Sequence, residues 1–216
     1  VCRIEEQKIK NKTFQSLVNM HPILPVYNEI LLPGAFLELL ISTPISIAAV
    51  EYHLSSGADI LVLPQHTQSD FPSQQELFPF GCRARVLRSL TIGEQSQSIL
   101  LEGLARIHAE DISLDEQVGY LAAAQPVHDQ EKTEEVLLFW MEKLQHSFRA
   151  LVRQNGEIHP DLLPLLDINI SDQRFMNLCC NQLMLNKEKR MILLASTNPI
   201  ERIQLLLTHI EQESDF

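Results

Sequence analysis

The sequence predicts an α+β fold in which a β-rich part precedes a helical part. Up to about residue 127, short apolar runs alternate with proline and glycine, and six of the seven glycines fall in this stretch. Beyond it, glycine almost disappears and apolar residues recur at intervals of three and four, as on one face of a helix. We therefore divide the chain into a polar N-terminal tail (1–20), a β-rich subdomain (21–127) and a helical subdomain (128–216).

Six strands are expected in the β-rich subdomain. Each is a short run rich in apolar residues and bounded by turn residues. The runs are 23–27, 35–41, 59–63, 81–90, 97–107 and 118–124. One helix interrupts them, because Pro44 suits its first turn after the capping pair Ser42-Thr43 and Gly57 suits its end. Its expected apolar face is made of Ile47, Val50 and Leu54.

The helical subdomain opens with a long helix. Acidic residues crowd its start, Arg149 and Arg153 lie near its end, and Asn155-Gly156 is expected to close it, as the helix dipole and C-cap preferences favour. Its predicted inner face consists of Leu137, Trp140, Leu144, Phe148 and Leu151.

Shorter helices follow. One is expected after Pro160, a second begins at Ser171-Asp172, and a third element covers residues 187–195. The last helix has the clearest start, since the N-cap, N1 and N3 positions of a capping box are filled by Asn198, Pro199 and Glu201.

Charge and composition argue against nucleic acid and anionic membranes as partners. The 17 Lys and Arg residues stand against 28 Asp and Glu residues, which gives a net charge of −11 that repels phosphate. Only 6% of the residues are aromatic, so a stacking platform for bases is hard to build. We interpret Lys8, Lys10 and Lys12 as part of a solvated tail. The chain contains no apolar run long enough for a membrane span or a signal peptide.

The four cysteines, Cys2, Cys82, Cys179 and Cys180, form neither a CxxC pair nor a regular disulfide framework. We expect reduced thiols, with one of the adjacent pair 179–180 in a core and the other partly exposed, and therefore a cytoplasmic location. Because the chain begins at Val1 rather than Met, we expect it to be a processed or excised piece.

Motifs for common enzyme chemistry are absent from the sequence. It has no GxxxxGK[ST], GxGxxG or GxSxG pattern, and its eight histidines show no HxH, HxxxH or HExxH spacing. A small hydrolase would need a paired nucleophile and base, which the sequence does not display. We therefore predict a chain that is not an enzyme and that uses no metal or other cofactor.

The segment 65–80 is the candidate for a binding surface. It sets Phe71, Leu77 and Phe78 among Gln, Ser, Thr and Asp residues. If exposed, these side chains offer an apolar patch to a peptide. The interpretation that we favour is that they fold down to cover the β-rich subdomain. We keep the three as candidate substrate-binding residues.

Several runs, taken in order, carry a resemblance to one protein family. Leu-Pro at 24–25 and Pro33-Gly34 are followed by SIAAVE at 46–51, ILVLPQ at 60–65, FGCRARVL at 80–87 and EGLAR at 102–106. The helical part continues the match at 171–175 and 198–207. Together, over about residues 22–211, these runs resemble the N-terminal, substrate-binding domain of the Lon ATP-dependent protease family.

This resemblance implies a pseudo-barrel of strands followed by a helical bundle. It also implies a non-catalytic domain that recognises unfolded or damaged proteins for an ATPase and a Ser-Lys peptidase located elsewhere in the parent chain. In isolation we expect a monomer or a weak dimer. The alternative is a free-standing LON-domain protein that binds a folded partner or a small ligand.

Residues of the matched runs also have roles that follow from their chemistry. Gly34, next to Pro33, and Gly103 meet backbone demands at a turn and at a β-bulge. Arg106 is expected to pair with Glu102 or with a carbonyl at the sheet edge. We interpret these residues as structural rather than as recognition residues.

Overall fold

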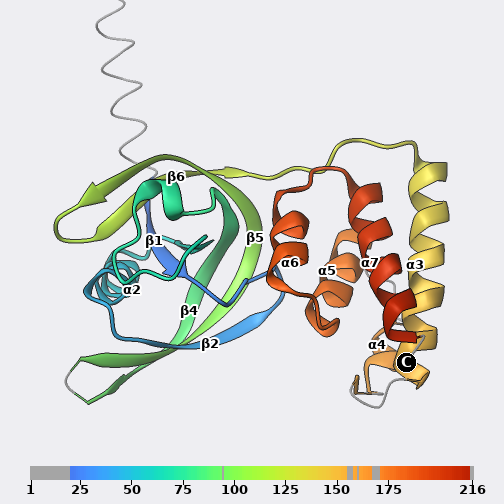
Figure 1. Cartoon of the computed structure of the whole chain (residues 1–216), viewed down its shortest axis with the longest axis horizontal. Helices are drawn as coiled ribbons and strands as arrows, with labels where there is room; N and C mark the ends of the chain where they lie inside the picture. The colour runs from blue at the N-terminus through green and yellow to red at the C-terminus, as the bar shows by residue number, and fades with distance from the viewer. Residues whose placement is uncertain (1–19, 94, 155–157, 160, 167–170, 215–216) are drawn as a thin grey trace, which may run out of the picture.

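The computed structural model describes residues 20–93, 95–154, 158–159, 161–166 and 171–214. Within them it confirms the predicted α+β fold, with a six-stranded sheet followed by the helices α3 to α7. Figure 1 shows the strands gathered at one end of the molecule and these helices at the other. The tail with Lys8, Lys10 and Lys12, and the helix end expected at Asn155-Gly156, lie outside the described residues.

The sheet curls into a barrel because its longest strand pairs with three others. The strands are β1 (Met20–Val26), β2 (Phe36–Ile41), β3 (Ile60–Pro64), β4 (Phe80–Ile92), β5 (Ser96–Asp115) and β6 (Gly119–Pro126). Their order is β2-β5-β4-β3-β1-β6, and the far part of β5 pairs with β6 to close the ring. The near part of β5 pairs with β2, so β2 lies outside the closed ring as an edge strand.

Helix α2 (Pro44–Ser56) has the predicted ends and part of the predicted buried face. The Thr43 hydroxyl accepts a hydrogen bond from Ser46 N (3.3 Å), and Gly57 ends the helix at a φ of 73°. Of the predicted apolar face, Val50 is buried and Ile47 packs against the barrel core, whereas Leu54 is 54% exposed, so the prediction is wrong for Leu54. The helix packs against β1 and β6, and its buried residues are Ser46, Ala49, Val50 and His53.

His53 is buried because it joins two backbone segments of the barrel. Its Nε2 accepts a hydrogen bond from Val86 N (3.1 Å), so its Nδ1 carries the proton that is donated to Ala58 O (2.5 Å). Helical periodicity alone does not predict this burial, because it takes no account of hydrogen-bond partners on distant strands.

The helical bundle buries the face that the spacing of α3 (Glu134–Gln154) predicts. Leu144, Phe148 and Leu151 are at most 1% exposed, whereas Leu137 and Trp140 are partly buried at the edge of the core. The other helices are α4 (Leu162–Leu166), α5 (Asp172–Gln182), α6 (Lys187–Ala195) and α7 (Pro199–Ser214). At the start of α7 the Asn198 side chain accepts a hydrogen bond from Ile200 N (3.2 Å), as expected for an N-cap.

Two residues of the connection between β1 and β2 join the bundle core. Ile30 and Leu32 are 4% and 2% exposed and cluster with the helical core residues rather than with the barrel. This connection therefore anchors the bundle to the barrel, and the sequence patterns did not predict it.

Candidate functional site

The segment between β3 and β4 does not present its three large apolar side chains on one surface. Leu77 is 3% exposed and belongs to the core beneath the segment, so the exposed-patch interpretation fails for it. Phe78 is half-buried, with ring centroids of His66 and Phe80 each 5.7 Å from its own. Of the three, only Phe71 is largely exposed, at 65%.

The backbone explains this separation. The 3-10 turn η1 (Gln74–Glu76) reverses the chain, after which Phe78 N donates a hydrogen bond to Pro64 O (2.7 Å) and Leu77 forms a bridge with Gln65. The segment thus returns along the end of β3. Because of this return, the Leu77 side chain is buried against the barrel, whereas the Phe71 side chain stays exposed at the outer tip of the segment.

Phe71 forms one wall of an apolar groove of about 320 Å³ at one end of the barrel. Leu114, near the end of β5, also lines it and is 63% exposed. The remaining lining residues are Pro44, Ile45 and Ala48 of α2, with Asp115, Glu116 and Gly119. Sequence analysis missed Leu114 because residues 108–115, which extend β5 beyond its predicted end, are mostly polar and show no strand alternation.

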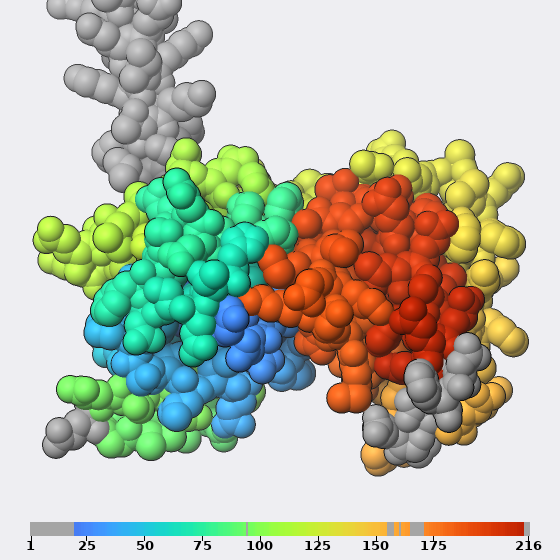
Figure 2. Space-filling model, viewed as in Figure 1, coloured from blue at the N-terminus to red at the C-terminus, as the bar shows by residue number. Residues whose placement is uncertain are grey.

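A second hollow, of about 260 Å³, adjoins this groove, since Ile45 lines both. It is walled by the end of β2, by residues 27–29 after β1 and by part of the segment 65–72. It carries two exposed carboxylates, Glu29 and Asp70. Figure 2 shows the teal segment after β3 beside the blue residues of β2 and α2. We call the groove and the hollow together the Phe71 face.

Phe78 lies elsewhere, at the junction between barrel and bundle. It lines a hollow of about 520 Å³ together with Tyr27, His66 and residues of α6. Lys187 spans this junction, because its Nζ lies 4.0 Å from the centre of the Tyr27 ring and donates a hydrogen bond to Gln65 O (2.8 Å). The structure therefore does not bring Phe78 together with Phe71.

The glycines of the matched runs fit the structural roles predicted for them. Gly34 has a φ of 78° at a turn, and its N donates to Gly103 O (2.9 Å) while Gly103 N donates to Ala35 O (2.9 Å). A Cβ on Gly103 would lie 2.3 Å from Leu32 O, so only glycine allows this close approach. The register of β4 and β5 shifts by one residue beside Gly103, as in a β-bulge. Pro33 is buried next to this contact.

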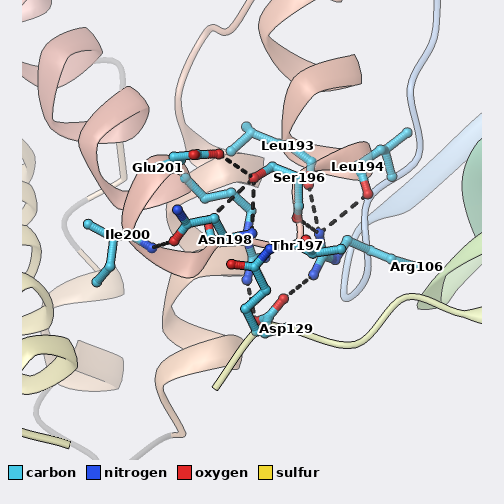
Figure 3. A network of polar contacts seen from close by, with 11 residues as sticks. Arg106, Asp129, Leu193, Leu194, Ser196, Thr197, Asn198, Ile200 and Glu201 are labelled. Atoms are coloured by element: carbon cyan, nitrogen blue, oxygen red, sulfur yellow. Dashed lines mark hydrogen bonds and ion pairs between the residues drawn. The ribbon is translucent and has the colours of Figure 1, made fainter. Parts of the chain in front are cut away.

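Arg106 reaches from β5 into the helical bundle, as Figure 3 shows. Its Nη1 donates to the carbonyls that end α6, at 3.2 Å to Leu193 O, 3.3 Å to Leu194 O and 2.6 Å to Ser196 O. Its Nη2 pairs with one carboxylate oxygen of Asp129, in the connection between barrel and bundle. The guanidinium thus joins the barrel to the end of a helix, where carbonyls lack helical partners.

The second carboxylate oxygen of Asp129 pairs with Arg202 of α7. The predicted pairing of Arg106 with Glu102 or with a sheet-edge carbonyl is wrong. The Glu102 carboxylate binds Arg85 Nε (2.8 Å) on the barrel surface, and the carbonyls that Arg106 binds end α6. Asp129 is one of the acidic residues near the start of α3 that the sequence analysis assigned to the helix dipole. No local signal marks a partner that lies 73 residues away along the chain.

Burial dominates the electrostatics of this junction. It lowers the pKa of Arg106, and the nearby Arg202 guanidinium lowers it further, while Asp129 opposes both effects. Burial also raises the pKa of the Cys180 thiol to about 12 and that of Cys179 well above its ordinary value. Both thiols are buried, so the expectation that one is partly exposed is wrong, and both are held protonated and unreactive.

Within the described ranges, no three His, Cys, Asp or Glu side chains lie close enough together to hold a metal ion. Of the helices described, none is both long and apolar enough to cross a membrane. The exposed Phe71 and Leu114 and the carboxylates Glu29 and Asp70 make the Phe71 face a candidate for binding through apolar contact and charge.

Comparisons with known proteins assign the family. The family model described as the ATP-dependent protease La (LON) substrate-binding domain matches residues 20–212. The Lon protease of Buchnera aphidicola is 24% identical over 195 residues, and the alignment covers 90% of this chain and 25% of that protein. The Lon protease of Cytophaga hutchinsonii is 25% identical over 213 residues, and the alignment covers 97% of this chain and 26% of that protein. The chain thus spans about a quarter of the length of these relatives.

Solved structures agree on the fold. The N-terminal domain of the Mycobacterium avium complex Lon protease aligns with a TM-score of 0.74 at 14% identity, over 89% of this chain and 98% of that one. The Lon N-terminal domain protein from Xanthomonas campestris aligns with a TM-score of 0.54 at 18% identity, over 88% and 97%. From the family match across almost all of its described residues, the chain belongs to the family of Lon protease substrate-binding domains.

Proposed function

We propose that this chain is the non-catalytic substrate-recognition domain of a Lon-type ATP-dependent protease and serves protein quality control. In this role it binds unfolded or damaged proteins and presents them to an ATPase and a Ser-Lys peptidase of the parent protein. We also propose that the protein is located in the cytoplasm and that the isolated domain is a monomer or a weak dimer. The absence of enzyme motifs from the sequence and the family match support it.

The observation that carries the proposal is the exposure of Phe71 and Leu114 in one groove. Folded proteins bury most large apolar side chains, whereas these two are 65% and 63% exposed and line the same concave surface. Unfolded proteins share no sequence but all display apolar segments. A groove of this kind suits such segments with low affinity per site, which several copies in one assembly would increase.

Fluorescence anisotropy tests the proposal with one labelled protein in two forms, native and irreversibly unfolded by reduction and alkylation. Moderate salt screens the net charge of −11. We expect saturable binding of the unfolded form and none of the native form. Binding of the native form alone would favour the alternative, a free-standing LON-domain protein that binds a folded partner.

The double variant Phe71→Ser with Leu114→Ser tests whether the unfolded protein binds in the groove. Covering each exposed side chain is worth about 1 to 2 kcal/mol, so removing both should lower the affinity about thirtyfold or more. Phe78 is left unchanged, because its half-buried ring supports the junction. The control is Leu138→Ser with Phe139→Ser on α3, which removes exposed apolar side chains (56% and 62%) from the bundle. Equal losses in both variants would contradict the assignment.

A further inference from the structure

Strand β2 has a free edge. It pairs with β5 on one side only, in the register Phe36↔Glu102 to Ile41↔Gln97, and no strand among the described residues pairs with its other side. Ala35 O accepts a hydrogen bond from Gly103 N (2.9 Å), so alternate residues after Ala35 bond to β5. The backbone N–H and C=O groups of Phe36, Glu38 and Leu40 therefore point to the free edge.

This edge has few of the devices that usually protect an edge strand, and its one charge is the exposed Glu38. Prolines, lysines and inward-pointing charges normally prevent further pairing, but β2 reads FLELLI. Phe36 and Leu40 are 65% and 68% exposed on its outer face. Across β5 the face is mixed, because Leu40 lies opposite the polar Ser98, which in turn lies opposite the 51% exposed Leu90. Figure 1 shows β2 running beside the β4–β5 arm that carries Leu90.

Carboxylates outnumber cations around the edge, since Glu38, Glu102, Glu29 and Asp70 lie there together with Arg85 and Arg88. The Glu38 side chain is 62% exposed and accepts from Arg88 Nη2 (3.2 Å) and Ser98 Oγ (3.3 Å), which leaves room for a further donor. The end of β2 also lines the hollow that carries Glu29 and Asp70. Two copies of β2 paired antiparallel about their centres would place Glu38 opposite Glu38, so the charge disfavours a second copy and favours a basic guest.

We propose that the free edge of β2 adds one extended segment of a client protein as an antiparallel strand. The edge prefers segments in which two apolar side chains flank a Lys or Arg at positions i, i+2 and i+4. The apolar pair then lies opposite Phe36 and Leu40, and the cation lies opposite Glu38. This inference rests on the proposed function and adds how the client is held. The hollow beside β2 shares Ile45 with the Phe71 groove, so one extended client can contact both.

Labelled peptides with the core Val-Thr-Lys-Thr-Val, titrated into the wild-type domain by anisotropy, test the backbone pairing. In the proposed register the Val, Lys and Val N–H groups face β2, and the two Thr N–H groups face away. N-methylation of Val, Lys and Val should weaken binding about tenfold or more, whereas N-methylation of both Thr residues should change it less than about twofold. Equal binding of both methylated peptides, or no binding of the unmodified peptide up to about 1 mM, would overturn the proposal.

A charge swap tests the preference for a cation. The Lys peptide should bind wild type about fivefold more tightly than the same peptide with Glu at that position, and Glu38→Gln should reduce this preference to about twofold. The control Glu142→Gln removes one exposed carboxylate from α3 and should leave the preference intact. An unchanged preference in Glu38→Gln would refute the assigned register.

The outcomes separate this inference from the proposed function. If unfolded protein binds and the Phe71 variants weaken it, but the methylated peptides behave alike, the function stands and the β2 edge is not the site. If wild type binds no unfolded protein, the function fails, while the peptide titrations still report on the edge. A concentration-dependent dimer in sedimentation velocity that is dissociated by the peptide would assign the edge to a second copy and overturn the client as its occupant.

Discussion

Replacing Arg106 by leucine should uncouple the helical bundle from the barrel. Arg106 is 4% exposed, and its guanidinium is held by Asp129 and by three carbonyls at the end of α6. Leucine fills part of the space but donates no hydrogen bond. Those carbonyls then lose their donor, and Asp129 keeps only Arg202.

The size of the loss follows from these contacts. Breaking a buried ion pair by removing one partner costs about 3 to 5 kcal/mol. Asp129 is partly exposed, at 25% for its side chain, and retains one arginine, so we take the lower end, about 3 kcal/mol. For a chain of this length that corresponds to a fall in Tm of about 6 to 12 °C.

Urea unfolding followed by two signals measures the uncoupling. The single tryptophan, Trp140, lies in α3, so its fluorescence reports on the bundle, whereas far-UV circular dichroism reports on both subdomains. In wild type the two transitions should coincide. In Arg106→Leu the fluorescence transition should occur at lower urea, because Asp129 and the carbonyls at the end of α6 all support the bundle.

Arg85→Leu is the matched control. Arg85 also pairs with a carboxylate, that of Glu102, but its side chain is 56% exposed, so the variant should lose less than about 1 kcal/mol and keep coincident transitions. The reasoning is refuted if Arg106→Leu loses no more free energy of unfolding than Arg85→Leu does.

Gly103→Ala should destabilise the protein by about 2 to 3 kcal/mol, because the added Cβ would lie 2.3 Å from Leu32 O. Gly34→Ala should cost only about 1 kcal/mol, since its Cβ meets nothing within 4 Å and only the left-handed backbone is strained; equal losses in calorimetry would contradict this. In a Cys2→Ser background, the buried thiols should react with a thiol reagent at pH 8 only as the protein unfolds. Burial raises the pKa of Cys82 and Cys180 from 9.0 to about 12, so the free energy of unfolding that these thiols contribute is complete below pH 9 and is lost as the pH rises toward 12. Urea unfolding at increasing pH measures this loss, and a free energy of unfolding that rises over the same range would contradict the prediction.

Local signals predicted most of the fold. Pro44 and Gly57 mark the ends of α2, and Asn198 with Pro199 marks the start of α7, because capping groups act within one helical turn. The predicted end of β5 was wrong. Its last residues are polar and exposed in a ribbon with β6, so no alternation of buried and exposed side chains marks them.

The candidate site was predicted only in part. Phe71 was named from its polar surroundings and is exposed, but the same argument named Leu77, which is buried. A polar neighbourhood in sequence does not reveal where a turn returns the chain to the sheet. The groove also needs Leu114 and Ile45, which lie far from Phe71 in sequence and meet it through the closure of the barrel.

The sequence by itself determined the order of a β-rich part and a helical part, the ends of several helices, the inner face of α3 and the family resemblance. These properties depend on periodicity, capping and turn residues within short windows of chain. Tertiary structure decided the partners of Arg106, the anchoring of Ile30 and Leu32 in the bundle, and the free edge of β2 beside the Phe71 face. Such contacts join residues far apart in sequence, and the register of the sheet and the packing of the two subdomains select them.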